Sequence, residues 1–202
     1  MSIRKRRSPD EARNEILAAA QDRLRLFGID GLNVVDVAKA CGMSHATVLH
    51  HFGSTAGMRH ALVTYMTAQL LEDIIASLQQ NPSLEPAQVL HSLFHTLSAG
   101  GHTKLLAWLS LAGNELAPEA APGALLQHHF NALIPVIAGR LPPSPKREEH
   151  ARRVVFLIAA AAIGSGVGGS VLATVIGLPQ EEIDHFPDWL GQQIYHLVSK
   201  EE

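Results

Sequence analysis

Cysteine is almost absent from this sequence, which contains only Cys41. A single cysteine excludes an intramolecular disulfide and a CxxC metal site, and it favours a reducing compartment. The basic residues near the N-terminus are not followed by an apolar run, so the chain shows no pattern of a secretory signal. We therefore expect a cytoplasmic protein.

The sequence also lacks the short motifs that accompany common catalytic sites. It contains no GxSxG nucleophile turn, no Walker loop and no HExxH zinc motif. The glycine-rich stretch 164–169 resembles a phosphate loop only superficially, because no predicted strand precedes it and no lysine follows it. We expect no enzyme activity and no cofactor.

Charged residues are few at 17% and aromatic residues make up 5%, whereas apolar residues, many of them alanine and leucine, reach 47%. This composition favours helices and a substantial core. The charge is unevenly divided: residues 1–60 hold nine Lys or Arg against six Asp or Glu, and the remainder holds seven against 13. A basic N-terminal part suits contact with phosphates, and an acidic remainder does not.

The stretch from Asn33 to Phe52 predicts two short helices joined by a tight turn. Asn33 is placed to cap the first helix, and Gly42 suits a turn that needs positive φ. Ser44 then restarts a helix, in which Val48 and Phe52 point inward. Small and hydrogen-bonding side chains remain on the outward face, as a helix in a DNA major groove requires.

Residues 31–58 resemble the DNA-binding domain of the TetR (tetracycline repressor) family. The matching positions are Val37, Ala38, Cys41, Gly42, Met43, Ser44, Thr47, Val48, His51, Phe52, Ser54 and Met58. The resemblance implies an all-α fold of about nine helices, with a helix-turn-helix domain at 1–53 and a helical ligand-binding and dimerisation domain at 54–202. It also implies a homodimer that binds double-stranded DNA and a small-molecule effector.

We expect DNA contacts from the second helix and its surroundings, and from a basic N-terminal arm, although such an arm is also compatible with a solvated tail. The predicted DNA-binding residues are Ser44, His45, Ala46, Thr47, His50, His51, Ser54, Arg4, Lys5, Arg6 and Arg7. Two positions depart from the family pattern: Leu49 replaces a usual tyrosine and Thr55 a usual lysine. Both changes remove phosphate contacts, so they should weaken DNA binding and its salt dependence.

Helical patterns cover most of the remaining chain. Ser8, Pro9 and Glu11 begin a helix that extends to about Phe27, and Ile16, Ala20, Leu24 and Phe27 form its inward stripe. A long helix is predicted from Ser54 to about Gln80. Further helices are expected at 86–99, 102–113 and 123–140, the last containing Pro135, then from Ser144 and finally after Pro179.

The stretch from Val154 to Leu178 carries no charge over 25 residues. Its length is compatible with a membrane span, but its many glycines and serines favour a helix packed closely against other helices. Pairing with the final helix and with a second subunit would cover both apolar surfaces. The predicted dimer interface contains Val167, Val171, Leu190, Ile194 and Leu197. No membrane partner is expected.

Twelve histidines invite a metal hypothesis, and His91 and His95 lie four residues apart, but no Asp, Glu or Cys stands beside them at ligand spacing. A polar lining for an apolar pocket and a structural role are the alternatives. The pocket candidates are Met66, Phe94, His95, Trp108, Leu109, Asn114, His128 and Phe130. We predict a transcriptional repressor that a hydrophobic effector releases from a near-palindromic operator. The alternative is a protein of the same fold that binds DNA weakly and acts in metal sensing or protein interaction.

Overall fold

The computed structural model describes residues 8–81, 85–99, 101–112 and 123–199. Within these ranges every regular element is helical, which confirms the expected all-α class. The elements are α1 (Pro9–Phe27), η1 (Ile29–Gly31), α2 (Val34–Ala40), α3 (His45–Phe52), α4 (Thr55–Gln80), α5 (Pro86–Ala99), α6 (His102–Ala112), α7 (Gly123–Ala138), α8 (Arg147–Ile176), α9 (Gln180–Asp184) and α10 (Phe186–Ser199).

The described ranges contain ten α-helices, one more than the approximate number expected from the sequence. The difference arises after Pro179, where one helix was predicted and two are present. Pro187 has no N–H to donate to the carbonyl of Ile183, so a helix that began at Gln180 cannot continue through it unbroken. The chain turns at His185 and restarts as α10.

Side-chain caps begin the first four α-helices at the predicted residues. Ser8 and Glu11 form a reciprocal capping box at α1. Asn33, Ser44 and Ser54 each accept a hydrogen bond from a backbone N–H in the first turn of α2, α3 and α4. Each cap satisfies a donor that the helix itself leaves unpaired, so these four starts follow from local sequence.

We call α1 to α3 the head. Its core also includes side chains from α4 and α6. The buried cluster comprises Ile16, Leu17, Ala20, Leu24, Leu32, Val34, Val37, Ala38, Val48, Met58, Leu62, Val63, Met66 and Leu105. The first half of α4 and Leu105 of α6 therefore complete the hydrophobic core of the helix-turn-helix.

Phe27 differs from the expectation that it lies in the inward stripe of α1. Its side chain is 59% exposed, whereas Ile16, Ala20 and Leu24 are buried as predicted. The guanidinium of Arg23 lies 4.6 Å from the centroid of the Phe27 ring and covers part of it. Phe27 is the last residue of α1, where the chain already turns into η1, so helical periodicity does not fix its direction.

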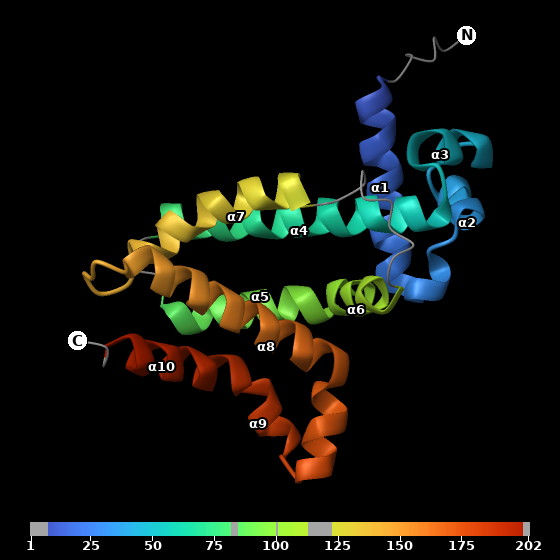
Figure 1. The fold of residues 1–202 in the computed structure, drawn as a ribbon. Coiled ribbons are helices and arrows are strands. Elements are labelled where there is room, and N and C mark those ends of the chain that lie inside the picture. The colour runs from blue at the N-terminus through green and yellow to red at the C-terminus, as the bar shows by residue number, and fades with distance from the viewer. Residues whose placement is uncertain (1–7, 82–84, 100, 113–122, 200–202) are drawn as a thin grey trace.

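We call the remaining helices, α5 to α10 with the second half of α4, the body. Figure 1 shows α7 alongside α4 in one layer, with α5, α6 and α8 in the next. α10 packs against the outer side of α5, and α6 lies between the head and α8.

Most buried apolar residues of the body fall into three clusters. One joins Phe94 and Leu97 of α5 to Ala162, Leu190 and Ile194. The second contains Leu71, Leu78 and Leu133, and the third contains Ile134, Ala138 and Ala151. Leu70, Ile74, Leu93 and Phe130 border these clusters and remain partly buried.

α8 exposes much of its apolar surface, and its C-terminal part projects beyond the other helices together with α9 (Figure 1). One exposed stripe follows helical spacing along its length. We call this stripe the α8 face: Phe156, Ala160, Gly164, Val167, Val171 and Val175. By length and composition alone, α4 and α8 are both apolar enough to cross a membrane.

Candidate nucleic-acid interface

The surface of α3 presents the side chains that the sequence predicts for a major groove. Ser44, His45, Ala46 and His50 are exposed, and Thr47 and His51 are partly exposed. The opposite side of the helix is anchored by Val48, which is completely buried in the head. The amphipathic pattern of this short helix therefore leaves hydroxyl and imidazole groups facing outward, where they can exchange hydrogen bonds with base edges.

Ser44 and Thr47 form a small hydrogen-bonded unit at the start of α3. The Ser44 hydroxyl accepts a hydrogen bond from the backbone N–H of Thr47 at 3.0 Å, and the two hydroxyl oxygens lie 2.7 Å apart. The cap therefore orients the Thr47 hydroxyl before any DNA is bound. Such pre-organisation reduces the entropy lost when a side chain makes a specific contact.

Arg13 of α1 holds the far end of α3, a role that local sequence did not predict. Its guanidinium donates to the carbonyl of His51 at 3.0 Å and lies 4.5 Å from the centroid of the Phe52 ring. The hydrogen bond satisfies a carbonyl that the end of the helix leaves unpaired. Its partner is 38 residues away in sequence, so no motif spacing could have revealed it.

Arg23 fixes the position of α2 in a comparable way. It donates to the carbonyl of Gly31 at 2.9 Å and to the carboxylate of Asp36 at 3.3 Å. The side chain of Asn33 donates to the same carboxylate at 2.8 Å. The hydrogen bond from Asn33, followed by the charges of Arg23 and Lys39, lowers the pKa of Asp36 despite an opposing desolvation.

The two departures from the family pattern lie on either side of the turn after α3, Leu49 within the last turn of α3 and Thr55 at the start of α4. Leu49 is partly buried against the head core, so it contributes packing where a tyrosine would carry a hydroxyl. Thr55 is the first residue of α4, next to the exposed cap Ser54. Gly57 allows this turn to be tight, because a Cβ there would collide with the carbonyl oxygen of Phe52. The arm residues Arg4, Lys5, Arg6 and Arg7 lie outside the described residues.

The pocket candidates that the structure describes are spread over several clusters. Met66 belongs to the head core, Phe94 to the α5–α10 cluster and Phe130 to the α4–α7 cluster. Trp108 packs against the head, and His128 is exposed on α7. Asn114 and the side chain of Leu109 lie outside the described part of the chain. The periodic pattern placed Met66 and Phe94 at buried positions but did not reveal which helices would share them.

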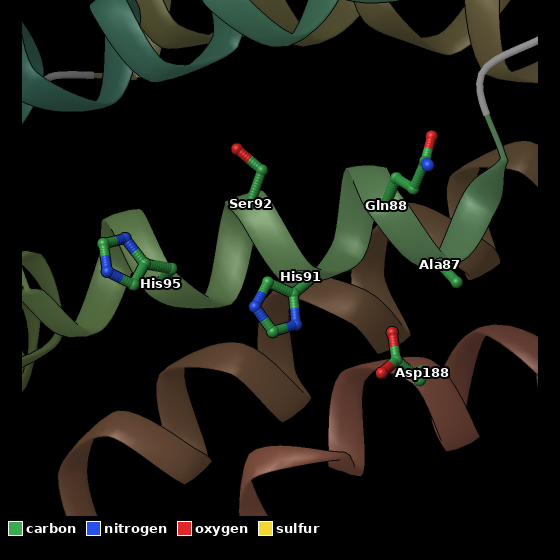
Figure 2. Close-up of a pocket in the computed structure, with 6 residues that line it drawn as sticks. All are labelled: Ala87, Gln88, His91, Ser92, His95 and Asp188. Carbon is green, nitrogen blue, oxygen red and sulfur yellow. The ribbon is translucent and has the colours of Figure 1, made fainter.

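An open groove of about 470 Å³ lies between α5 and α10, and it includes one predicted pocket residue, His95. Figure 2 shows its lining residues Ala87, Gln88, His91, Ser92, His95 and Asp188. His91 points toward α10, whereas His95 lies one turn further along α5 and points away from Asp188 (Figure 2). Among the described residues, no group of three or more His, Cys, Asp or Glu side chains is arranged to hold a metal ion.

The predicted dimer residues divide into two groups. Val167 and Val171 of α8 are 53% and 66% exposed, and the side chain of Leu197 is not among those described. Leu190 and Ile194 are only 7% and 8% exposed, because α10 turns them toward Phe94 and Leu97 of α5. Within the subunit these two residues are therefore core residues rather than surface residues.

The head and body together define an all-α helix-turn-helix protein with a long helix, α4, shared between its two parts. Residues 16–62 match the family model described as bacterial regulatory proteins, tetR family. The match covers the helix-turn-helix and the start of α4, and the whole chain has the fold of solved TetR-family transcriptional regulators.

Three solved structures illustrate that fold. A Mesorhizobium loti protein assigned to TetR-family transcriptional regulators is 15% identical, covers 95% of this chain and 98% of its own, and has a TM-score of 0.65. The repressor AlkX from Dietzia sp. is 21% identical, with coverage of 93% and 95% and a TM-score of 0.61. FadR from Thermus thermophilus, in complex with lauroyl-CoA, is 20% identical, with coverage of 90% and 92% and a TM-score of 0.55. None of the curated proteins compared with the chain matches it.

Proposed function

We propose that this protein is a homodimeric, ligand-responsive repressor of transcription that leaves a near-palindromic operator when a small hydrophobic effector binds. The observation that carries the proposal is the outward face of α3, held by Ser44, Arg13 and Val48 within a tetR-family domain. Two such heads in a two-fold dimer require two half-sites in opposite orientation, separated by about one helical turn of DNA or more.

Selection of the purified protein against random duplex DNA tests the DNA-binding part of the proposal. We expect enrichment of a palindrome whose affinity falls steeply with salt, because phosphate contacts release counterions. If the folded protein enriches no DNA sequence, the proposed repressor function is refuted. Such a result would favour the alternative, a protein of this fold in which Leu49 and Thr55 have removed operator binding.

The base-reading role of α3 is tested by replacing Thr47 and His50 with alanine. We expect altered base preference within each half-site while the salt dependence stays similar, because these side chains face base edges rather than phosphates. Leu26, which is exposed on α1 away from α3, provides an Ala control that should leave preference unchanged. Selection of the same palindrome by the Thr47→Ala/His50→Ala variant would contradict this assignment.

The proposed effector is hydrophobic, and the partly buried apolar side chains that border the body clusters support this choice. Leu70 of α4 and Leu93 of α5 border one cluster, and Ile74 of α4 and Phe130 of α7 border another, so a slender apolar molecule at either place would contact two helices. Two proteins of the same fold point the same way: AlkX is implicated in the biodegradation of n-alkanes, and the Thermus FadR was solved with lauroyl-CoA.

Lauroyl-CoA is therefore a suitable first probe, alongside dodecane and free coenzyme A. If the effector acts by shifting a conformational population, bound DNA must weaken effector binding by the same factor by which the effector weakens DNA binding. Isothermal titration of the effector with and without the selected duplex, and of the duplex with and without the effector, measures the two factors. An effector affinity that the duplex leaves unchanged would refute release by this mechanism.

The metal-sensing alternative depends on His91 and His95. Titration with Zn²⁺ and Ni²⁺, repeated on the His91→Ala/His95→Ala variant, separates it from the repressor. Stoichiometric metal binding by the wild-type protein that is lost in the double variant would support the metal-sensing alternative. No detectable metal binding would exclude it.

A further inference from the structure

α6 lies between the head and α8, and close packing joins it to both. Leu105 is completely buried in the head core. On the other side, Thr103 packs directly on Gly166 of α8, where an added Cβ would collide with the Thr103 side chain. At the start of α6, an added Cβ on Gly101 would lie 3.0 Å from Leu24 Cγ of α1. A displacement of α6 therefore has to move either the head or α8.

Arg59 supplies polar contacts where α6 meets the head. Its Nε donates to the carbonyl of Leu32 and its Nη2 to the carbonyl of Ile29, both at 3.1 Å. The same guanidinium lies 4.6 Å from the centroid of the Trp108 ring of α6. One side chain thus holds the link before α2 with two directed hydrogen bonds while its flat face contacts an aromatic ring of α6.

We propose that Arg59 and Trp108 are positioning residues that hold the head at one angle to the body through α6, and thereby fix the half-site spacing that the dimer accepts. This inference rests on the proposed function, because it requires two heads and an operator. Both residues lie away from the exposed face of α3, so they act on the placement of a head rather than on its base contacts.

The test uses duplexes that carry two copies of the half-site selected by the wild-type protein, with spacers of varied length, and a duplex with one half-site. The wild-type protein should prefer one spacing sharply. In Trp108→Leu the preference for that spacing over its neighbours should fall roughly tenfold, as loss of a partly desolvated cation–π contact implies. Affinity for the single half-site should stay unchanged, a result that a misfolded head would not give.

Three further variants sharpen the test. Trp108→Phe keeps an aromatic ring and should retain part of the preference. Arg59→Met combined with Trp108→Leu should broaden the spacing preference no more than Trp108→Leu alone. Arg59 joins the head to Trp108 and Trp108 joins Arg59 to α6, so loss of Trp108 already breaks this connection. Gly166→Ala should move the preferred spacing, since its Cβ displaces α6 from α8.

Arg140→Met is the matched control. Arg140 also donates to two main-chain carbonyls, those of Leu78 and Asn81, but it does so at the opposite end of α4, away from the head. Its loss should leave the spacing preference intact. If the wild-type protein selects no duplex, the proposed function fails and the inference with it. If a duplex is selected and Trp108→Leu keeps the wild-type spacing profile, or loses half-site affinity in step with it, the inference alone is overturned.

Discussion

Two histidines are buried beside the joint between head and body. His60 of α4 and His102 of α6 are each 6% exposed. Both ring nitrogens of His60 and Nδ1 of His102 are buried without a hydrogen-bond partner in the structure. Burial lowers the pKa of both imidazoles below the ordinary value of 6.5, although backbone groups of Met66 and Thr96 oppose the shift at His102. Both rings are therefore held in their neutral form.

This burial predicts a loss of stability in mild acid. Below pH 6.5 the unfolded chain takes up protons that native His60 and His102 resist, so the free energy of unfolding falls as the pH drops toward their native pKa values. His60→Leu removes one such site and should flatten this decline in urea unfolding curves recorded between about pH 5 and 7. His91→Leu, at an exposed position on α5, should leave the slope unchanged. An equal slope in His60→Leu and the wild type would refute the assignment.

Residues that act locally were predictable, and residues that act across the chain were not. The caps Ser44 and Ser54 follow from hydrogen bonds within three residues. Arg13, Arg23 and Arg59 hold the helix-turn-helix through partners eight to 38 residues away. In the sequence they are only basic residues on helices, which is also the pattern of a solvated surface.

At the scale of elements, the turn between α2 and α3 depends on one glycine. Gly42 has φ of +63°, a value that a side chain disfavours even though no other atom lies within 4 Å of an added Cβ. Gly42→Ala should therefore lower the free energy of unfolding by about 1 kcal/mol.

Gly139→Ala is the matched control for that prediction. A Cβ at Gly139 meets only the carbonyl oxygens of Pro135 and Val136 at 3.5 Å, and its φ lies outside the positive region. The substitution should be neutral or stabilising by up to about 1 kcal/mol, because alanine reduces the entropy of the unfolded chain. Urea unfolding of both variants gives the comparison. An equal decrease in the free energy of unfolding for both variants would show that replacing a glycine in general, rather than the left-handed backbone of Gly42, determines the loss of stability.

Helix positions were predicted better than helix partners. The bounds of α4 and α5 follow from a cap, a Pro or Asn and the apolar period, all of which are local. Pro187 indicates a break between α9 and α10, but the apolar stripe of Phe186, Leu190 and Ile194 favoured the prediction of one helix. That stripe was correct for α10, yet it could not show that α5 of the same subunit covers it.

At the scale of the whole molecule, the sequence could indicate two parts but not how they share a core. The expected boundary at residues 53 and 54 follows the end of the helix-turn-helix motif, and it remains a prediction. The head core nevertheless includes Met58, Leu62 and Leu105. Such contacts depend on where α6 returns in space, which periodicity within one helix does not encode. Met66, Phe94 and Phe130, three of the predicted pocket residues, lie at separate clusters for the same reason.

Seven of the 11 exposed large apolar side chains among the described residues lie on α8, and a second copy is the partner we expect to cover the α8 face. Val167, Val171 and Val175 recur every four residues, and Gly164 on the same stripe permits a close helix approach. Leu190 and Ile194 are already covered by α5, so in our expectation α8 supplies the central contact.

Val171→Asp should therefore convert the dimer into monomers, because a carboxylate buried between two apolar helices has no partner. Sedimentation equilibrium measures the change. Arg152→Asp, which places the same carboxylate near the start of α8 and breaks only an exposed ion pair with Glu148, should leave the dimer intact. A monomeric Val171→Asp should still bind one half-site but lose the preference for a fixed spacing, since that preference requires two joined heads. A wild-type chain that is soluble only in detergent would contradict this account and favour a membrane role for the same face.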